Sequence, residues 1–253
     1  MRILDKKYFT NYINQTGKFI PLLIEKYDFT GEQDDFSYLT KVSAVYSSNI
    51  EGNTIDLNSY MNYKLSKSKF KPSKEIEEIE DLVKAYEFAQ SHKLNEKNLL
   101  EVHKISSKTL LIKSKRGHYR EEPVGVFGKY GLIYLAIEPE YLKKELKIFF
   151  NDIDTLLKSD LTPEEVFYHA SLIHLIFVHL HPFMDGNGRI ARLLEKWFIA
   201  EKSGNKFWKL QTEECYKNNQ AKYYEAINIG VNYYELNYDK CINFLKLLPN
   251  CIK

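Results

Sequence analysis

The feature that most constrains the fold is the segment from Val166 to Leu180, which carries apolar side chains on nearly every side. A helix with no polar face must be buried on all sides. Its start is marked by Thr162 followed by Pro163 and two glutamates, the pattern of a capped first turn. Its end is set by His181-Pro182, because a proline disfavours the α-conformation of the residue before it. The sequence therefore predicts an all-α fold, a helical bundle around a central buried helix.

Further helices are expected where apolar residues recur at steps of three and four. One begins near Gly188 and presents an apolar face that includes Leu193, Leu194 and Trp197. The last third of the chain, residues 213–248, is also expected to be helical and is rich in tyrosine. The other helices are predicted over residues 40–50, 75–89, 95–111 and 138–157.

A small β-hairpin interrupts the helical pattern. Residues 124–127 and 132–135 are short β-prone runs, and a glycine-bearing loop of residues 128–131 joins them. Such a pair is typical of a hairpin. Because a lone hairpin is only marginally stable in water, this one is expected to rest on helices.

Composition narrows the classes of function. The chain has 253 residues, of which 44% are hydrophobic and 28% charged, an ordinary globular balance. The net charge of +2 argues against a protein that coats nucleic acid, so nucleic acid is not an expected partner. No apolar run approaches the ~18 residues of a membrane span, and the N-terminus has no signal-peptide pattern. No membrane association is therefore expected.

The cysteines indicate a cytoplasmic protein. Cys215, Cys241 and Cys251 are odd in number, lack the spacing of a CxxC pair and lie near the C-terminus. Neither a disulfide framework nor a structural zinc site is expected from this pattern. A reducing, cytoplasmic compartment is the interpretation that follows.

Residues 181–192 contain the chemistry of a phosphate site, in the order His-Pro-Phe-Met-Asp-Gly-Asn-Gly-Arg-Ile-Ala-Arg. Gly186, Asn187 and Gly188 precede a helix whose first amides have no partner within the helix. Successive N–H groups in such a loop can converge on an anion, with the helix dipole behind them. Phosphate is the expected guest. Arg189 and Arg192, in the first turns of that helix, add donors for phosphate oxygens.

A metal ligand and a base flank this loop. Asp185 lies beside the glycines, and a carboxylate next to a phosphate site commonly holds Mg²⁺, which keeps substrate phosphates and water as its other ligands. His181 stands at the end of the buried helix. A histidine near its ordinary pKa of about 6.5 suits a general base at neutral pH. The expected task is removal of a proton from an attacking hydroxyl.

The twelve residues resemble the core motif of the Fic family, enzymes that transfer AMP from ATP to protein hydroxyls. The resemblance spans roughly residues 99–227. It implies that His181 is the general base and that Asp185 binds Mg²⁺ bridging the α- and β-phosphates. It further implies that residues 186–188 form the anion hole, that Arg189 holds the phosphates, and that Arg192 holds the γ-phosphate.

Two other segments are similar to family features. The hairpin, with the Gly117-to-Arg120 run before it, resembles the flap that registers a target segment by strand addition over the active site. Tyr223 and Tyr224 resemble part of a late helix that borders the adenine pocket.

An upstream segment resembles the inhibitory motif of the family. Ser47 is followed by three residues and then by Glu51 and Gly52. Gly52 is expected to cap a helix that Glu51 closes. A carboxylate in a last helical turn opposes the helix dipole, so it is expected to have a cationic partner elsewhere. In the family this partner is the second arginine of the core motif, here Arg192, and its occupation would block the seat of the γ-phosphate.

These features predict three parts. Residues 1–94 form an N-terminal helical region that carries the inhibitory helix, at about 40–52. Residues 95–201 form the Fic catalytic core with its flap at 117–137, and residues 202–253 form C-terminal helices.

The predicted function is that of an autoinhibited protein adenylyltransferase that modifies a Tyr, Ser or Thr hydroxyl. ATP and a target protein are the expected partners and Mg²⁺ the expected cofactor, while self-modification and a homodimer are left open. UMP transfer and removal of AMP are alternatives on the same fold. A regulatory binding module is an alternative of another class, which the intact His181 and Asp185 disfavour.

Overall fold

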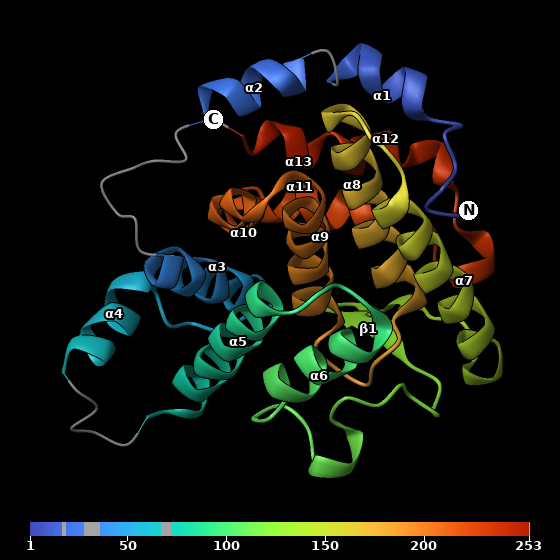
Figure 1. The fold of residues 1–253 in the computed structure, drawn as a ribbon. Helices are drawn as coiled ribbons and strands as arrows, with labels where there is room; N and C mark the ends of the chain where they lie inside the picture. The colour runs from blue at the N-terminus through green and yellow to red at the C-terminus, as the bar shows by residue number, and fades with distance from the viewer. Residues whose placement is uncertain (17–18, 28–35, 67–71, 253) are drawn as a thin grey trace.

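The central helix forms as predicted. The computed structural model describes residues 1–16, 19–27, 36–66 and 72–252. Helix α8 spans Pro163–Leu180, begins with a capping box between Thr162 and Glu165, and is buried at every residue from Val166 onward. It packs mainly against α9, Asn187–Ser203, and both helices lie at the centre of the bundle (Figure 1).

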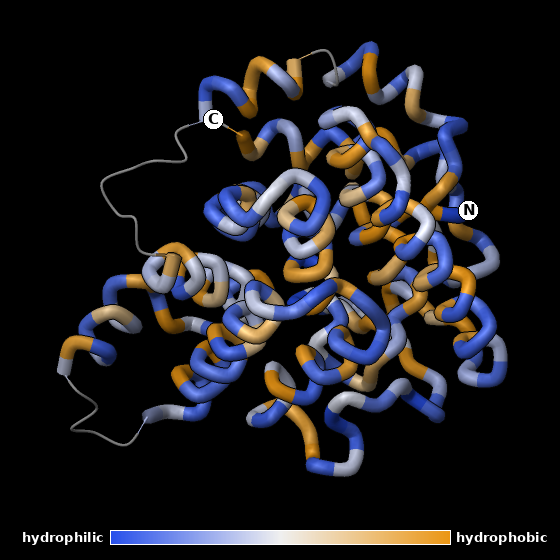
Figure 2. The backbone as a smooth tube through the Cα atoms, viewed as in Figure 1, coloured by the Kyte–Doolittle hydropathy of each residue, from blue (hydrophilic) through white to orange (hydrophobic). Residues whose placement is uncertain are grey.

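The other helices surround this pair. Helices α3 and α5 lie against each other and against α9, while α1 and α2 contact α8 at the end where the C-terminal helices gather (Figure 1). Hydrophobic and hydrophilic residues alternate along most helices (Figure 2), and most of the buried residues are hydrophobic. The remaining α-helices of the described chain are α1 Phe9–Gln15, α2 Ile20–Lys26, α3 Phe36–Ile50, α4 Leu57–Leu65, α5 Lys74–Ser91, α6 Glu96–Ser106, α7 Pro139–Lys158, α10 Thr212–Asn218, α11 Gln220–Ile227, α12 Ile242–Leu245 and α13 Leu247–Asn250.

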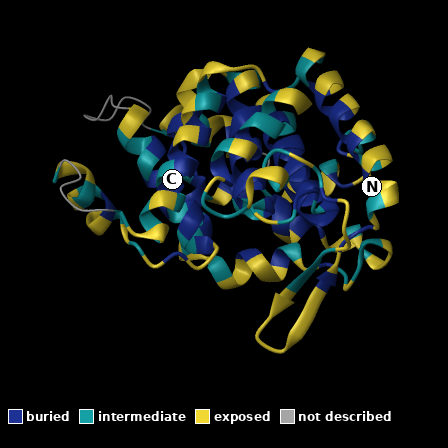
Figure 3. Cartoon of the chain, turned by 90° about the horizontal axis from the view of Figure 1, so that it is seen from below, coloured by how far each residue is buried: buried dark blue, intermediate teal, exposed yellow. Residues whose placement is uncertain are grey.

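The hairpin is present and projects from the helical body (Figure 3). Strands β1, Gly125–Gly128, and β2, Gly131–Leu135, pair antiparallel with an irregularity after Val126. Most of the hairpin is exposed, but Tyr134 turns inward and its hydroxyl donates to the carbonyl of His179, 2.6 Å away. A buried tyrosine that reaches a backbone acceptor supplies the helix contact that an isolated hairpin lacks.

The C-terminal third is less regular than the sequence predicts. Short 3₁₀ turns, Tyr233–Glu235 and Tyr238–Lys240, occupy the stretch between α11 and α12. The side chains of Asn232 and Asn237 accept hydrogen bonds from backbone amides just ahead of them. Such local bonds compete with a helix, which explains why apolar periodicity alone overestimates helix length here.

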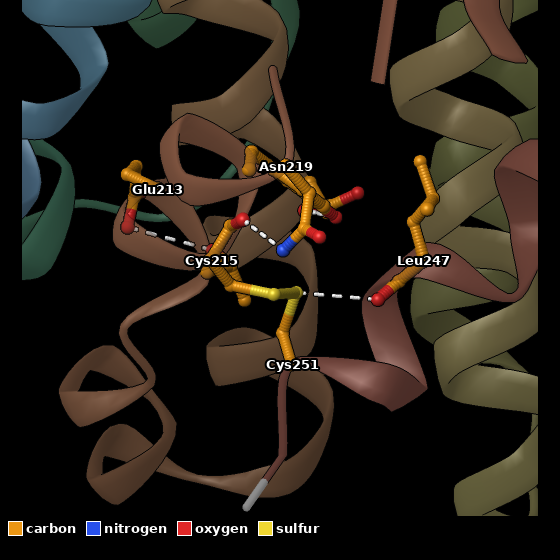
Figure 4. Close-up of a disulfide and its surroundings, with 8 residues drawn as sticks. Glu213, Cys215, Asn219, Leu247 and Cys251 are labelled. Atoms are coloured by element: carbon orange, nitrogen blue, oxygen red, sulfur yellow. Dashed lines mark hydrogen bonds between the residues drawn. A yellow bond between two sulfur atoms is a disulfide. The ribbon is translucent and has the colours of Figure 1, made fainter. Parts of the chain in front are cut away.

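The expectation that the cysteines stay unpaired is wrong. Cys215 on α10 forms a disulfide with Cys251 at the end of α13, whereas Cys241 is free and buried (Figure 4). The two half-cystines are 36 residues apart, and the fold brings their Cα atoms to 5.5 Å. Spacing along a chain identifies local cysteine pairs, but it carries no information on pairs that tertiary structure brings together.

The membrane expectation meets no opposing observation. Within the described residues, no helix combines the length and the apolar character needed to cross a bilayer.

The disulfide is expected to stabilise the fold measurably. Closing a loop of 36 residues removes unfolded-state entropy worth about 3–4 kcal/mol, so Cys251→Ser should lower the melting temperature by roughly 10 °C. Thermal unfolding followed by circular dichroism checks this. A reducing agent should lower the wild-type midpoint and leave Cys251→Ser unchanged; equal effects on both proteins would contradict the prediction.

Candidate active site

His181 lies in an unusual backbone conformation at the C-terminal end of α8. Its φ is 47°, and it is the only non-glycine residue with a positive φ in the part of the chain that the structure describes. A left-handed conformation at a residue with a β-carbon costs energy and persists only where surrounding contacts impose it. The following proline disfavours the α-helical conformation at His181. The helix therefore ends here, and the imidazole lies at the start of the next loop.

The ring of His181 is prepared to accept a proton at Nε2. Its Nδ1 lies 3.2 Å from the carbonyl oxygen of Val178. Because a carbonyl only accepts hydrogen bonds, Nδ1 carries the proton of the neutral ring and Nε2 keeps its lone pair. Burial lowers the pKa of His181, and the nearby charge of Arg120 lowers it further. The ring is therefore neutral at neutral pH, as a general base must be.

The side chain of Asn187 closes the loop that follows His181. It accepts from the backbone N–H of Phe183 and donates to the carbonyl of the same residue, both at 2.9 Å. Gly186 precedes the helix with a φ of 83°, a conformation that glycine adopts readily. The N–H groups of residues 187–189 then lie in the first turn of α9, where no acceptor in the described residues meets them. Free amides at a helix N-terminus are suited to bind an anion, and the anion site stays a prediction.

Asp185 is exposed beside these amides. One carboxylate oxygen accepts from the N–H of Gly186 at 2.6 Å, which leaves the second oxygen without a protein partner among the described residues. Within those residues no cluster of three acidic, histidine or cysteine side chains could form a complete metal cage. A single carboxylate fits Mg²⁺ that arrives with phosphates and water, because this ion takes few protein ligands.

Arg189 keeps part of its guanidinium free. The side chain is buried, and its Nε has no hydrogen-bond partner within the described part of the chain. A terminal nitrogen lies 3.8 Å from Glu78, at the long end of the ion-pair range. A buried donor without a partner is costly, so an anion at this place would satisfy it.

Four of the five N–H donors of Arg192 are in hydrogen bonds. The side chain is 0% exposed, and its Nε and Nη2 donate to the hydroxyl and the carbonyl of Ser47 at 2.9 and 3.0 Å. Nη2 also donates to Glu51 at 2.7 Å, and Nη1 donates to the hydroxyl of Tyr223 at 3.1 Å. The upstream motif and the second arginine of the loop, 141 residues apart, therefore form one ion pair. No donor of this guanidinium is directed to solvent.

The carboxylate of Glu51 also lies against the start of α9. A β-carbon placed on Gly188 would come within 2.3 Å of its Oε1, so a larger residue at this position would displace the carboxylate. Burial by itself would raise the pKa of Glu51, but the charge and the hydrogen bond of Arg192 outweigh burial and hold that pKa below its usual 4.5. Glu51 follows the last residue of α3, and Gly52 completes the turn with a φ of 97°.

Helices α10 and α11 hold the end of α3 in place. Lys217 donates to the carbonyl of Asn49, and Gln220 and Tyr224 both donate to that of Ile50, at 2.7–2.9 Å. These groups cover carbonyls that a helix end leaves without partners, and the lysine also complements the dipole.

The two predicted adenine-pocket residues face different surroundings. Tyr224 is partly exposed beside the inhibitory turn. Tyr223 is 1% exposed, and its hydroxyl is engaged by Arg192 and His174, so in this conformation it lies beneath the site. Their role toward adenine stays a prediction.

Part of the chain is similar to a known protein family. Residues 93–199 match the model of the Fic/DOC family. This match includes the whole loop from His181 to Arg192. Proteins of this family generally transfer a nucleoside monophosphate to proteins. No curated protein sequence is significantly similar to the chain.

Solved structures of Fic proteins share the fold over nearly the whole chain. A Fic family protein from Desulfovibrio desulfuricans G20 has a TM-score of 0.77 at 22% identity and covers 95% of this chain and 73% of its own. A Fic domain containing signaling protein from Bacteroides thetaiotaomicron VPI-5482 has 0.69 at 20% identity, covering 95% and 92%. Fic-1 from C. elegans, residues 134–508, has 0.69 at 19% identity, covering 96% and 70%. At these identities the likeness shows the fold alone.

One residue of the matched segment that the sequence did not single out for this site is His103 on α6. It is fully buried, stacks on the ring of Phe183 at 3.6 Å, donates from Nε2 to the carbonyl of Asp185, and accepts at Nδ1 from Gly117 N–H. Burial lowers its pKa to about 4, so it stays neutral and keeps both bonds. A lone histidine on a helical face gives no sequence signal of such a bridge.

The ion pair of Glu51 is expected to make stability depend on pH. A carboxyl whose pKa is depressed by folding stabilises fully above its unfolded pKa, and this contribution is lost as pH falls through the folded-state value. Glu51→Gln should therefore be less stable than wild type at pH 7, with the gap closing below about pH 4.5. Melting temperatures from pH 7 to pH 3 measure the gap. Glu225→Gln, at an exposed site on α11, serves as control, and a gap independent of pH would refute the prediction.

Proposed function

We propose that this protein is an adenylyltransferase that transfers AMP from ATP to a protein hydroxyl and is inhibited by Glu51. The proposal rests on one observation: a candidate base and several hydrogen-bond donors without partners lie at the same loop. His181 has a free Nε2, and the amides of residues 187–189 and the Nε of Arg189 lack partners within the described residues. Such groups suit in-line attack on a phosphate.

In the proposed reaction, His181 Nε2 takes the proton of a target Tyr, Ser or Thr hydroxyl. The hydroxyl oxygen forms a bond to the α-phosphorus, and the bond from that phosphorus to the β-phosphate bridging oxygen breaks, so pyrophosphate leaves with the electron pair. The amides at the start of α9 and Arg189 stabilise the charge that develops on the phosphate oxygens. Asp185 would hold Mg²⁺, which would neutralise part of the negative charge of the phosphates.

Glu51 inhibits this reaction because its carboxylate occupies the position beside Arg192 that a phosphate would take. Arg192 can receive a γ-phosphate only when a donor becomes free, and Glu51 occupies Nη2 at 2.7 Å. The carboxylate also covers Gly188, at the entrance to the amide site. ATP that binds beside Glu51 would therefore place its phosphates away from the in-line geometry, which reduces the rate strongly.

Labelled ATP tests the reaction and the inhibition together. With α-labelled ATP we expect little self-labelling of wild type, at least about tenfold more in Glu51→Gly, and none in Glu51→Gly/His181→Ala. Label retained on the protein is measured after denaturing electrophoresis. Equal labelling of wild type and Glu51→Gly would refute inhibition. Transfer of label from γ-labelled but not α-labelled ATP would refute AMP transfer.

The metal assignment has its own test. In the Glu51→Gly background, Asp185→Asn should lower the rate of AMP transfer about a hundredfold, because the amide cannot neutralise Mg²⁺. The exposed Asp160→Asn, outside the flap and the loop, is the matched control and should retain the parental rate. Rates are measured over a range of Mg²⁺ concentrations. A Mg²⁺ dependence that is the same in Asp185→Asn and its parent would show that another group holds the ion.

A further inference from the structure

The flap segment, residues 117–137, covers several carbonyls at the C-terminal end of α8. The successive carbonyls of residues 179–182 lie at the helix end and just beyond it, where carbonyls have no partner within the helix. Tyr134 donates its hydroxyl to the first of them at 2.6 Å. Arg120 donates from its guanidinium to the next two, at 3.4 and 2.7 Å, and from its backbone N–H to the last at 2.9 Å. His181 lies within this capped stretch.

Arg120 binds backbone carbonyls and forms no ion pair with the described residues. Its side chain is buried, and its other donors reach the carbonyls of Glu122 and Ile137, one on each side of the hairpin. Within the described residues no carboxylate lies at ion-pair distance from it. A cation set against helix-end carbonyls interacts favourably with the dipole, and its planar fork can serve several acceptors at once.

The same guanidinium acts on the base electrostatically. The charged groups that act on His181 are Arg120, Glu51 and Asp185, of which Arg120 lowers the pKa of the ring and the two carboxylates raise it. When Glu51 moves away, Asp185 is the carboxylate that still counteracts the lowering of the His181 pKa by Arg120.

We propose that Arg120 is a positioning residue, which fixes the left-handed turn at His181 and couples the seating of the flap to the placement of the base. The inference rests on the proposed function. A flap that docks a target strand pulls on the same arginine that holds His181, so binding of the target and alignment of the base are mechanically linked.

The test uses two substitutions in the full chain. Arg120→Lys keeps the charge but loses the fork, and Arg120→Gln loses the charge as well. In the Glu51→Gly background both should lower kcat for AMP transfer at least about tenfold with the KM for ATP little changed, because the base is misplaced. Arg116→Gln, which removes a charge just before the flap segment, at a side chain that donates to the carbonyl of Leu111, should keep the parental rate.

A titration of His181 by NMR of histidine-labelled protein separates positioning from a loss of stability. Arg120→Gln should raise the pKa of His181 by about half a unit, whereas Arg120→Lys and Arg116→Gln should leave it near the wild-type value. If Arg120→Gln does not fold, Arg120→Lys decides: a folded protein with parental kcat overturns the proposal.

The remaining outcomes are also distinguishable. An unchanged pKa in Arg120→Gln, with kcat lowered only in proportion to thermal stability, would show a purely structural role and overturn the proposal. Absence of AMP transfer from Glu51→Gly itself, with the pKa shift present, would refute the proposed function while supporting the link between Arg120 and His181.

Discussion

The arrangement of the helices around the site depends on the hydrogen bonds and the ion pair that the buried guanidinium of Arg192 requires. Burying a charge without partners is strongly unfavourable, so a fully buried Arg192 dictates what surrounds it. α3 provides Ser47 and Glu51, and α11 provides Tyr223. Only Glu51 among these partners carries a formal charge. Arg192 is therefore neutralised by the carboxylate of Glu51, and under the proposed function inhibition would be the exchange of this carboxylate for a phosphate at the same arginine.

A second buried cation explains the register of α3. One helical turn beyond Arg192 on α9, Lys196 donates to Ser43, which lies one turn before Ser47 on α3. Lys196 also pairs with Glu213 on α10 at 2.5 Å. The two cation–serine contacts lie side by side along the two helices, so a slip of α3 by one turn would break both contacts and leave the buried Arg192 without its carboxylate. Glu51 thus reaches Arg192 because the whole helix is held in register.

The sequence predicts those parts of the structure that several neighbouring residues specify together, through an apolar run, a capping pattern or a motif. The uniform apolar run of α8 and its capping pattern specify the central helix, and the residues of the phosphate loop lie together with Glu51 as the motifs indicate. Helices α1 and α2 have only seven residues each and gain their stability from tertiary contacts, so their periodicity is weak. The Cys215–Cys251 pair depends on the fold that joins distant segments. Arg120 and His103 act through backbone carbonyls and amides, whose positions a sequence does not display.

The contacts at the end of α3 determine how Glu51 can move away from Arg192. Lys217, Gln220 and Tyr224 hold the carbonyls that precede Glu51, so the end of α3 is fixed. The side chain of Glu51 is 29% exposed and has its ion pair with Arg192 as its strong tie. Rotation about its side-chain bonds toward solvent breaks one ion pair, whereas movement of the backbone breaks three further hydrogen bonds and disturbs two buried cations. Rotation of the Glu51 side chain therefore breaks fewer contacts than movement of α3, and under the proposed function it is the route by which Arg192 would become available to an anion.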